Sequence, residues 1–335
     1  MRISNFKSCL GTLALALGLA LSATLAGADA AALRLVHTVP LPQTAGRFDH
    51  CSIDAAGNRL FIAALGNDTA EIVDLEKFAR IHTIRGLHKP TGVAYLPEVG
   101  RIVAANGGDG TLQVFDGATF GLLAQLTDLD DADNVRVDAA ENRIYVGFAN
   151  GALGVTDIAA KQLLARIPLK GHPESFQLEQ SGTRIFVNVP DSNMIAVVDR
   201  AKASVVAQWP MEKFRANFPM ALNEANHRLF VGCRRPARLV IFDTVAGKPV
   251  SDLEISGDTD DLFFDAKRQR LYVSCGEGFI DIIQCRDGDR YERIARLPTR
   301  SGARTSFFSP ELDRLYLAVP QRGGHDAELR IYQPN

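Results

Sequence analysis

NRLFIA, at residues 58–63, is the first of seven short stretches in which an arginine precedes a run of apolar residues. The other six read GRIVAA, NRIYVG, TRIFVN, HRLFVG, QRLYVS and DRLYLA, and their arginines are Arg101, Arg143, Arg184, Arg228, Arg270 and Arg314. Counted from Arg59, the arginines follow one another at spacings of 42, 42, 41, 44, 42 and 44 residues. A regular period of about 20–50 residues is the signature of a repeat architecture, so this pattern decides the fold class.

Each repeat contains four short apolar segments separated by turn-forming residues. In the first repeat, the turn AAGN (55–58) precedes the arginine stretch, and ARIHTI (79–84) is the fourth segment. The third segment ends in an acidic residue in five repeats: Asp74, Asp116, Asp157, Asp199 and Asp243. Runs of β-branched and aromatic residues bounded by turn chemistry are strands. Four antiparallel strands at a period of 40–45 residues predict one blade of a β-propeller.

The two ends of the chain predict how the ring closes. The seventh repeat stops after its third strand, LRIYQPN (329–335), and therefore lacks a fourth. Near the N-terminus, LRLVHTVPLP (33–42) resembles fourth strands such as LLARIPLKG (163–171). Pairing the N-terminal strand with the last blade leaves no open sheet edge. We therefore predict an all-β fold in which residues 31–335 form a single seven-bladed β-propeller, with four antiparallel strands per blade and the last blade closed by the N-terminal strand.

The first thirty residues have the pattern of a secretory signal peptide. Arg2 and Lys7 form a basic region, and an apolar run follows at residues 10–25. Small residues then offer cleavage sites at 26–28 and 28–30. This order predicts that residues 1–30 are a cleaved signal peptide. No later stretch is long and apolar enough to span a bilayer, so the mature protein is expected in the periplasm or outside the cell.

Composition and charge exclude several classes of protein. The 335 residues are 46% hydrophobic and 23% charged, which is ordinary for a globular protein and excludes a disordered chain. The formal net charge is −2, so the chain lacks the overall basic character of a nucleic-acid-binding protein. Nucleic acid is therefore an unexpected partner, and a small polar ligand or another protein is expected instead. We expect the chain to be monomeric.

Four cysteines follow the predicted signal peptide, at Cys51, Cys233, Cys275 and Cys285. An even number of cysteines in an oxidising compartment allows disulfides. Cys233 and Cys275, however, occupy the same position in successive repeats, and Cys51 belongs to another strand of a distant repeat. We predict that all four are free thiols that act as small hydrophobic residues.

The repeats resemble the YVTN family of propeller repeats, whose signature is a Pro-entered first strand and a Tyr-Val-x-Asn-like second strand. The matching segments are KPTGVAYL with RIVAANGGDGTLQVFD (89–96, 101–116), HPESFQLEQSGTRIFVNVPDSNMIAVVD (172–199), NRIYVGFANG (142–151) and QRLYVSCGEG (269–278). The resemblance covers the mature chain and is greatest to the YncE-like periplasmic proteins. It implies a propeller that serves as a binding or surface protein. Related propellers include lactonases and metal-dependent sugar-lactone hydrolases.

Polar residues recur at the positions expected to surround the mouth of the central channel. In a propeller, the loops that enter each first strand line this mouth, and they lie nine and ten residues before each anchoring arginine. Five carboxylates, one histidine and one arginine occupy these positions. The candidate ligand-binding residues are Asp49, His50, Asp133, Asn134, Glu174, Asn217, Asp260, Asp261 and Arg304. They form either a site for a hard cation or polar substrate, or solvated loop ends that cap turns.

The sequence leaves two functions open. The first is a binding scaffold that presents its acidic central face to a small ligand, a cation or a protein partner. The second is a metal-dependent hydrolase of lactone or ester type, in which an axial divalent cation activates water. No HExxH, GxSxG or CxxCH motif is present, so no catalytic or metal-ligating residue is assigned. His88 and His172 precede the prolines of non-adjacent blades and are given no role.

Overall fold

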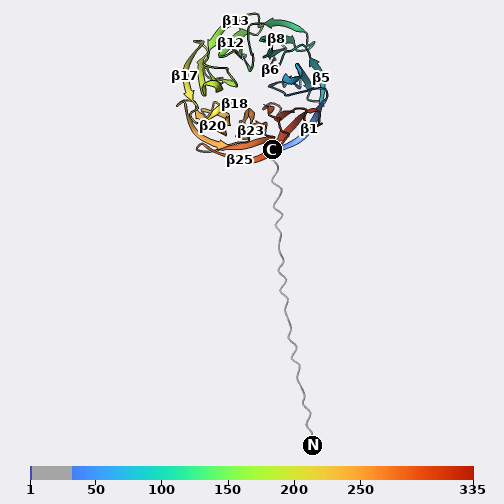
Figure 1. The fold of residues 1–335 in the computed structure, drawn as a ribbon, viewed down its shortest axis with the longest axis vertical. Helices are drawn as coiled ribbons and strands as arrows, with labels where there is room; N and C mark the ends of the chain where they lie inside the picture. The colour runs from blue at the N-terminus through green and yellow to red at the C-terminus, as the bar shows by residue number, and fades with distance from the viewer. Residues whose placement is uncertain (2–31) are drawn as a thin grey trace. The chain divides into compact units, whose positions relative to one another are not determined.

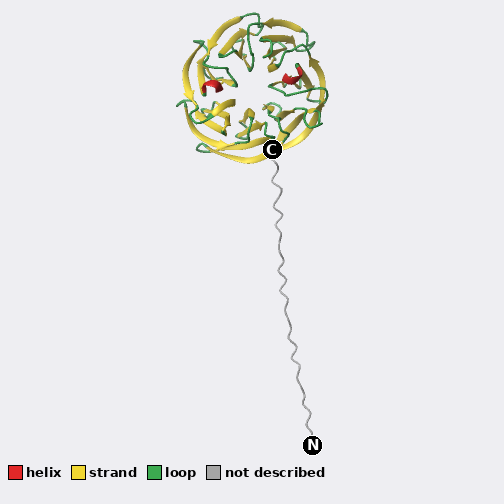
Figure 2. Cartoon of the chain, viewed as in Figure 1, coloured by secondary structure: helices red, strands yellow, loops and turns green. Residues whose placement is uncertain are grey.

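The arginine-anchored stretches form the second strands of seven four-stranded antiparallel sheets. The sheets are arranged around a common centre, with β6 and β18 toward the centre and β5, β13, β17 and β25 at the rim (Figures 1 and 2). This computed structural model describes Met1 and residues 32–335. The predicted signal peptide lies, apart from Met1, outside the described residues. The predicted seven-bladed propeller is confirmed for the rest of the chain.

Blades 1 to 4 follow one another along the chain, each with its strands in sequence order. Their strands are β2 (Cys51–Asp54), β3 (Arg59–Ala64), β4 (Thr69–Asp74) and β5 (Ala79–Ile84); β6 (Pro90–Leu96), β7 (Arg101–Asn106), β8 (Thr111–Asp116) and β9 (Leu122–Leu126); β10 (Val135–Asp138), β11 (Arg143–Phe148), β12 (Ala152–Asp157) and β13 (Leu163–Pro168); and β14 (Phe176–Leu178), β15 (Arg184–Val189), β16 (Met194–Asp199) and β17 (Ser204–Pro210).

Blades 5 to 7 complete the ring. Their strands are β18 (Arg215–Asn223), β19 (Arg228–Arg235), β20 (Ala237–Asp243) and β21 (Lys248–Glu254); β22 (Thr259–Asp265), β23 (Arg270–Cys275), β24 (Phe279–Arg286) and β25 (Arg290–Pro298); and β26 (Thr305–Ser309), β27 (Arg314–Val319), β28 (Ala327–Pro334) and β1 (Leu33–Leu41). Two short 3-10 helices, η1 (Leu65–Asn67) and η2 (Pro190–Ser192), lie in turns. No helix among the described residues is long and apolar enough to cross a membrane.

The N-terminal strand closes the last blade, as predicted. β1 pairs antiparallel with β28 from Leu33 opposite Pro334 to Leu41 opposite Ala327, and it completes the sheet order β1-β28-β27-β26. In Figure 1, β1 lies in blue beside the red C-terminal strands. The ring therefore has no unpaired strand where the chain ends meet.

The hydrophobic core lies between neighbouring blades. Each of seven buried clusters joins residues of two adjacent blades; one, for example, packs Phe61 of blade 1 against Val93 of blade 2. Strand β1 contributes to two clusters, with Leu33 between blades 6 and 7 and with Val39 and Leu41 between blades 7 and 1. Each blade is consequently held by both neighbours.

The repeated arginine links its own blade to the next. Arg59 donates hydrogen bonds to Asp54, at the end of the first strand of blade 1, and its guanidinium lies 5.5 Å from the ring of Tyr95 in blade 2. Arg228 forms the corresponding link between blades 5 and 6, because its Nε donates to Asp289 at 2.6 Å. Four of the seven repeated arginines, Arg59, Arg184, Arg228 and Arg270, make such a contact with the next blade.

In the five blades whose third strand ends in an acidic residue, this residue organises the turn that follows. Asp74 Oδ1 accepts hydrogen bonds from the backbone N–H of Glu76 at 3.0 Å and of Lys77 at 2.8 Å. Asp116 and Asp243 make equivalent bonds in blades 2 and 5. An Asp side chain that binds backbone groups two or three residues ahead stabilises a tight turn. These repeated carboxylates are therefore structural.

The four cysteines after the predicted signal peptide are free, and three of them, Cys51, Cys233 and Cys275, are buried. Burial raises the pKa of Cys233 to about 12, which keeps its thiol protonated and unreactive. We expect thiol titration of denatured, non-reduced protein that starts at residue 31 to find four thiols per chain. A count of two or fewer would show that a disulfide forms.

Candidate functional site

The loops that enter the first strands meet in a cavity at one end of the central channel. Its volume is about 220 Å³, and we call it the cup. The cup is lined by Arg47, Asp49, His50, Thr91, Asp131, Asp133, Asn134, His172, Glu174, Ser175, Phe218, Arg234, Asp260 and Arg304. Seven of the nine predicted site residues are among them, all except Asn217 and Asp261. Positions far apart in the sequence therefore meet at this end of the ring.

A repeated β-bulge directs these side chains toward the cup. Ala63 of β3 accepts a hydrogen bond from the N–H of Asp49 and donates one to the carbonyl of His50. Gly147 bonds in the same way to Asp133 and Asn134, and Asn188 to Glu174 and Ser175. Two residues directly before the first strand thus lie opposite one residue of the second, which is the bulge arrangement that re-aims side chains near functional sites.

The two predicted residues that do not line the cup have other places. Asn217 is fully buried between blades 4 and 5, where its Nδ2 donates to Asn188 Oδ1 at 2.9 Å and to the Met194 carbonyl at 3.0 Å. Asp261 lies deeper in the channel, where its Oδ2 accepts from the backbone N–H of Ser306 at 2.7 Å. Asn217 therefore supports the backbone beneath the cup rather than facing a ligand there.

On one side of the cup, arginines compensate the carboxylates. Asp260 pairs with Arg234 and with Arg304, whose Nε lies 2.8 Å from Asp260 Oδ2. Asp49 pairs with Arg47 at 3.0 Å. Even so, burial raises the pKa of Asp49 to about 7; His50 opposes this rise, and the carboxylates of Asp133 and Asp260 add to it. The arginines on this side therefore only partly offset the burial of Asp49 and its repulsion from the other carboxylates.

His50 separates the cup from the deeper channel and lies between two carboxylates. Its Nε2 is 3.7 Å from Asp49, and its Nδ1 is 3.5 Å from Asp261. Burial opposes a charge on His50, but the hydrogen bond with Asp261 and the charges of Asp49, Asp261 and Asp133 outweigh burial and raise its pKa to about 10. His50 is therefore an imidazolium at neutral pH.

Alkaline pH is expected to destabilise the protein through His50. The folded state holds the extra proton up to about pH 10, whereas the unfolded chain releases it near pH 6.5. This stabilisation is complete below about pH 6.5 and is lost as the pH rises through 10. The unfolding free energy of the parent should fall between pH 7 and 9.5, as measured by denaturant unfolding. In H50Q this fall should be smaller by about 1–3 kcal/mol. The exposed-site variant H325Q should keep the full fall, and an undiminished fall in H50Q would contradict the assignment.

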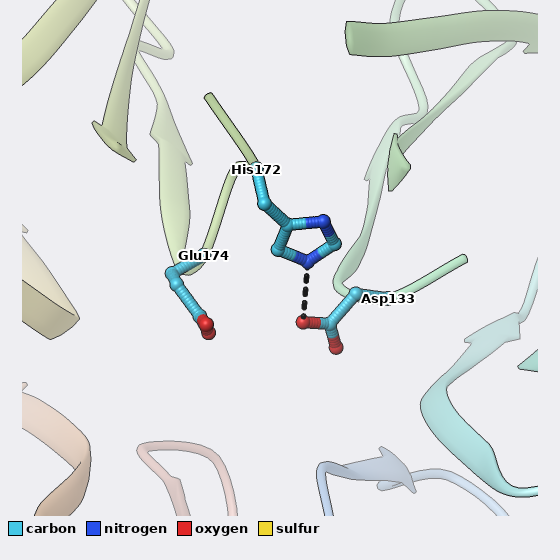
Figure 3. A group of neighbouring side chains, drawn as sticks. All are labelled: Asp133, His172 and Glu174. Atoms are coloured by element: carbon cyan, nitrogen blue, oxygen red, sulfur yellow. Dashed lines mark hydrogen bonds and ion pairs between the residues drawn. The ribbon is translucent and has the colours of Figure 1, made fainter. Parts of the chain in front are cut away.

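On the opposite side of the cup, Asp133, His172 and Glu174 converge. One oxygen of each carboxylate and one nitrogen of the imidazole all lie within 4.8 Å of one another. Figure 3 shows the three side chains pointing toward a common centre from neighbouring loops. His172 Nε2 lies 3.5 Å from Asp133 Oδ2, but among the described residues the Glu174 carboxylate has no hydrogen-bond or ion-pair partner. Burial and the charges of Asp133 and Asp260 raise the pKa of Glu174 to about 8.

Backbone contacts fix the orientation of the His172 ring. Its Nδ1 lies 2.8 Å from the carbonyl oxygen of Ala149. A carbonyl only accepts, so Nδ1 carries a proton, and Nε2 is the atom that faces Asp133 and the cup. Burial opposes a charge on His172, but the contacts with Asp133 and with the Ala149 carbonyl outweigh it and raise the pKa of His172 to about 9, so Nε2 is also protonated at neutral pH. A metal ion that displaces this proton would meet a ring held through its other nitrogen by a carbonyl, which is the usual arrangement of a metal-ligating histidine.

Asn134 supplies an independent sign that the cup accepts a ligand. Its side chain lines the cup and is 1% exposed, and its Oδ1 has no hydrogen-bond partner. An unsatisfied buried amide oxygen costs about 1–3 kcal/mol unless a partner binds it. Asn134 directly follows Asp133 in the bulge, so this oxygen belongs to the same wall.

Sequence reasoning missed several residues of the cup, above all His172. It lies twelve residues before Arg184, outside the two positions that the arginine register singles out. Its proximity to Glu174, two residues ahead on the same loop, was the available signal. Arg47 and Asp131 were missed for the same reason, because they lie on the loops rather than at the bulge.

Comparisons with known proteins show the fold and no more. No protein-family model and no curated protein matches the chain. A chain of hydrazine synthase from Kuenenia stuttgartiensis is similar, with a TM-score of 0.71 and 17% identity over 84% of this chain and 93% of that one. A chain from a crystal structure of the mitotic checkpoint complex is similar with a TM-score of 0.76 and 11% identity, over 99% and 98%. The class of protein defined here is a seven-bladed propeller whose axial cup is lined by carboxylates, arginines and histidines.

Proposed function

We propose that the protein is a binding propeller that captures a divalent transition-metal ion in the cup, with Asp133, His172 and Glu174 as its ligands. The observation that carries the proposal is the Glu174 carboxylate, which is directed at the same centre as Asp133 and His172 and has no hydrogen-bond or ion-pair partner among the described residues. A bound cation would neutralise this carboxylate and offset its repulsion from Asp133. The unsatisfied oxygen of Asn134 in the same wall supports this interpretation.

The donor set favours a transition metal over calcium or magnesium. Calcium and magnesium take oxygen ligands, whereas imidazole nitrogen suits zinc, iron, copper and nickel. Small rotations of three side chains that already lie within 4.8 Å of one another would bring them to metal–ligand distances of about 2.0–2.2 Å. The proposal therefore takes a mixed nitrogen and oxygen site, where a hard-cation site was one of the alternatives that the sequence left open.

The proposed cellular setting rests on the sequence. The leader at residues 1–30 and the YVTN-like pattern support a periplasmic or secreted protein of the YncE-like kind. The role that fits this setting is that of a scaffold, which holds the metal or presents it to a small polar ligand or a protein partner. Three protein ligands leave room on the metal for such a ligand.

The same open position supports a second candidate function. A metal with three protein ligands and a bound water is the arrangement of catalytic zinc sites, in which the water becomes a nucleophile near neutral pH. This favours the lactone or ester hydrolase considered from the sequence. A screen of lactones and esters before and after chelation tests it, because turnover abolished by a chelator would show an enzyme rather than a scaffold alone.

Calorimetric titration of the metal-free protein with zinc or cobalt chloride tests the proposed function. We expect one ion to bind per chain and calcium to bind far more weakly. The variant H172Q should weaken zinc binding at least about tenfold, since a lost imidazole ligand costs at least as much as a lost supporting contact. The matched control is H88Q, because His88 precedes the corresponding proline in blade 2 and does not line the cup. No zinc binding, or equal binding by H172Q, would contradict the proposal.

A further inference from the structure

The channel below the cup contains a second and larger cavity. Its volume is about 420 Å³, and we call it the chamber. It is lined by residues of the first strands of all seven blades, together with His50. Aliphatic side chains and the rings of Tyr95, Phe263 and Phe307 make up much of the wall, and Ser52 and Gln177 add polar atoms. A cavity of this size whose wall combines apolar side chains with several polar groups is suited to a small molecule.

Arg136 brings a positive charge to this wall. Its Nη1 donates to the Val135 carbonyl at 2.9 Å, its Nη2 donates to Ser175 Oγ at 3.4 Å, and its guanidinium lies over the ring of Phe176. Among the described residues, no carboxylate lies within ion-pair distance of Arg136. A guanidinium has five N–H donors, and these two hydrogen bonds use only two of them, so donors remain for a ligand. Burial lowers the pKa of Arg136, in keeping with a guanidinium that lacks an anionic partner.

The carboxylate of the chamber is already engaged elsewhere. Asp261 is the one acidic residue among the lining residues, and it accepts from the N–H of Ser306 and contacts His50 at 3.5 Å. The charge of Asp261 is therefore balanced by the His50 imidazolium. Arg136 has no such ion-pair partner among the described residues, so the charged groups that line the chamber, Arg136, His50 and Asp261, leave it a net positive charge.

We propose that the chamber is a binding site for a small organic carboxylate with an apolar body, in which Arg136 binds the carboxylate and the aromatic wall contacts the apolar body. A planar guanidinium matches a carboxylate through two parallel hydrogen bonds. Tyr95, Phe263 and Phe307 favour a ligand with a flat or aliphatic body over a bare inorganic anion. The site is separate from the proposed metal ligands and does not require the metal.

The test uses 3-phenylpropionate as the probe, with its neutral amide and inorganic phosphate as matched comparisons. Binding is measured by calorimetry and by melting temperature in the presence of a chelator, so that failure of the metal site does not affect the result. We expect the carboxylate to bind and to raise the melting temperature. We expect the amide and phosphate to bind at least about tenfold more weakly. The amide lacks the charged group that Arg136 binds, and phosphate lacks the apolar body that the aromatic wall contacts.

Two variants connect the binding to the chamber. R136M keeps much of the side-chain volume and removes the charge, and it should abolish carboxylate binding. R166M is the control, because Arg166 of the same blade also lies over an aromatic ring, that of Phe148, but is exposed and does not line the chamber. If R136M does not fold, S52D adds a carboxylate to the wall with Arg136 in place and should also abolish binding. Equal binding of acid and amide, equal binding of phosphate, or binding unchanged in the folded variants would overturn the proposal.

Discussion

A protein that starts at Thr44 is expected to melt at least about 10 °C below one that starts at Ala32, or to lose its cooperative transition. The shortened protein lacks β1, so β28 becomes an unpaired edge at the place where the ring closes. An exposed edge strand also invites association with other chains. The effect should therefore appear both in the melting temperature and in a tendency to aggregate.

The expected size of this effect follows from the residues that β1 buries. Leu33, Val39 and Leu41 are between 0% and 2% exposed, and each contributes about 1.5–3 kcal/mol by burial. Their sum is comparable to the total stability of about 5–15 kcal/mol of an ordinary domain. Loss of β1 also opens two of the seven cores between blades.

Point variants distinguish the loss of the contacts that β1 makes from an unspecific effect of shortening the chain. The double variant V39A/L41A should lower the melting temperature, whereas T38A, at an exposed position of the same strand, should leave it nearly unchanged. A synthetic peptide of residues 31–43 should restore part of the lost stability when added to the shortened protein. An unchanged melting temperature in the shortened protein would contradict the proposed closure.

The second large effect is that of the substitution E174Q on stability. It should stabilise the metal-free protein but remove the stabilisation that zinc gives the parent. E174Q is expected to stabilise the metal-free protein by about 1–3 kcal/mol, because it removes a desolvated carboxylate that faces Asp133 and Asp260 without a partner. Zinc at about a hundred times its dissociation constant should stabilise the parent by about 2.7 kcal/mol. The same zinc concentration should leave E174Q nearly unaffected.

Thermal melts of the parent and E174Q, with and without zinc, measure this reversal. E141Q is the control, because Glu141 is an exposed carboxylate of blade 3 that does not line the cup. It should melt like the parent under both conditions. A lower melting temperature for metal-free E174Q, or a zinc effect that survives the substitution, would show that Glu174 serves a structural role.

The fold was predictable because residues that stabilise the blades and their turns recur in the sequence at a regular spacing. Arg59 and Arg228 occupy the same position in their repeats and each contacts the next blade, and Asp74 belongs to a recurring set of carboxylates that cap turns. The closure followed from counting strands, since a seventh blade with three strands needs a fourth from elsewhere. These features are local and periodic, and a single sequence shows them directly.

The site was only partly predictable, because its geometry depends on the bulges and on the loops. The arginine register located Asp49, Asp133 and Glu174 at the cup, yet it could not show that a bulge turns their side chains inward. Asn217, one position before the register, was also expected at the mouth, whereas this residue is buried between blades. The register gave no role to His172, whose position depends on a backbone carbonyl of another blade.

Anomalous diffraction from crystals soaked in zinc chloride, recorded on both sides of the zinc absorption edge, tests the metal site most directly. We predict one anomalous peak in the cup, within about 2.0–2.2 Å of His172 Nε2 and of a carboxylate oxygen from each of Asp133 and Glu174. A cup without a peak, in crystals that bind zinc at other places, would contradict the account.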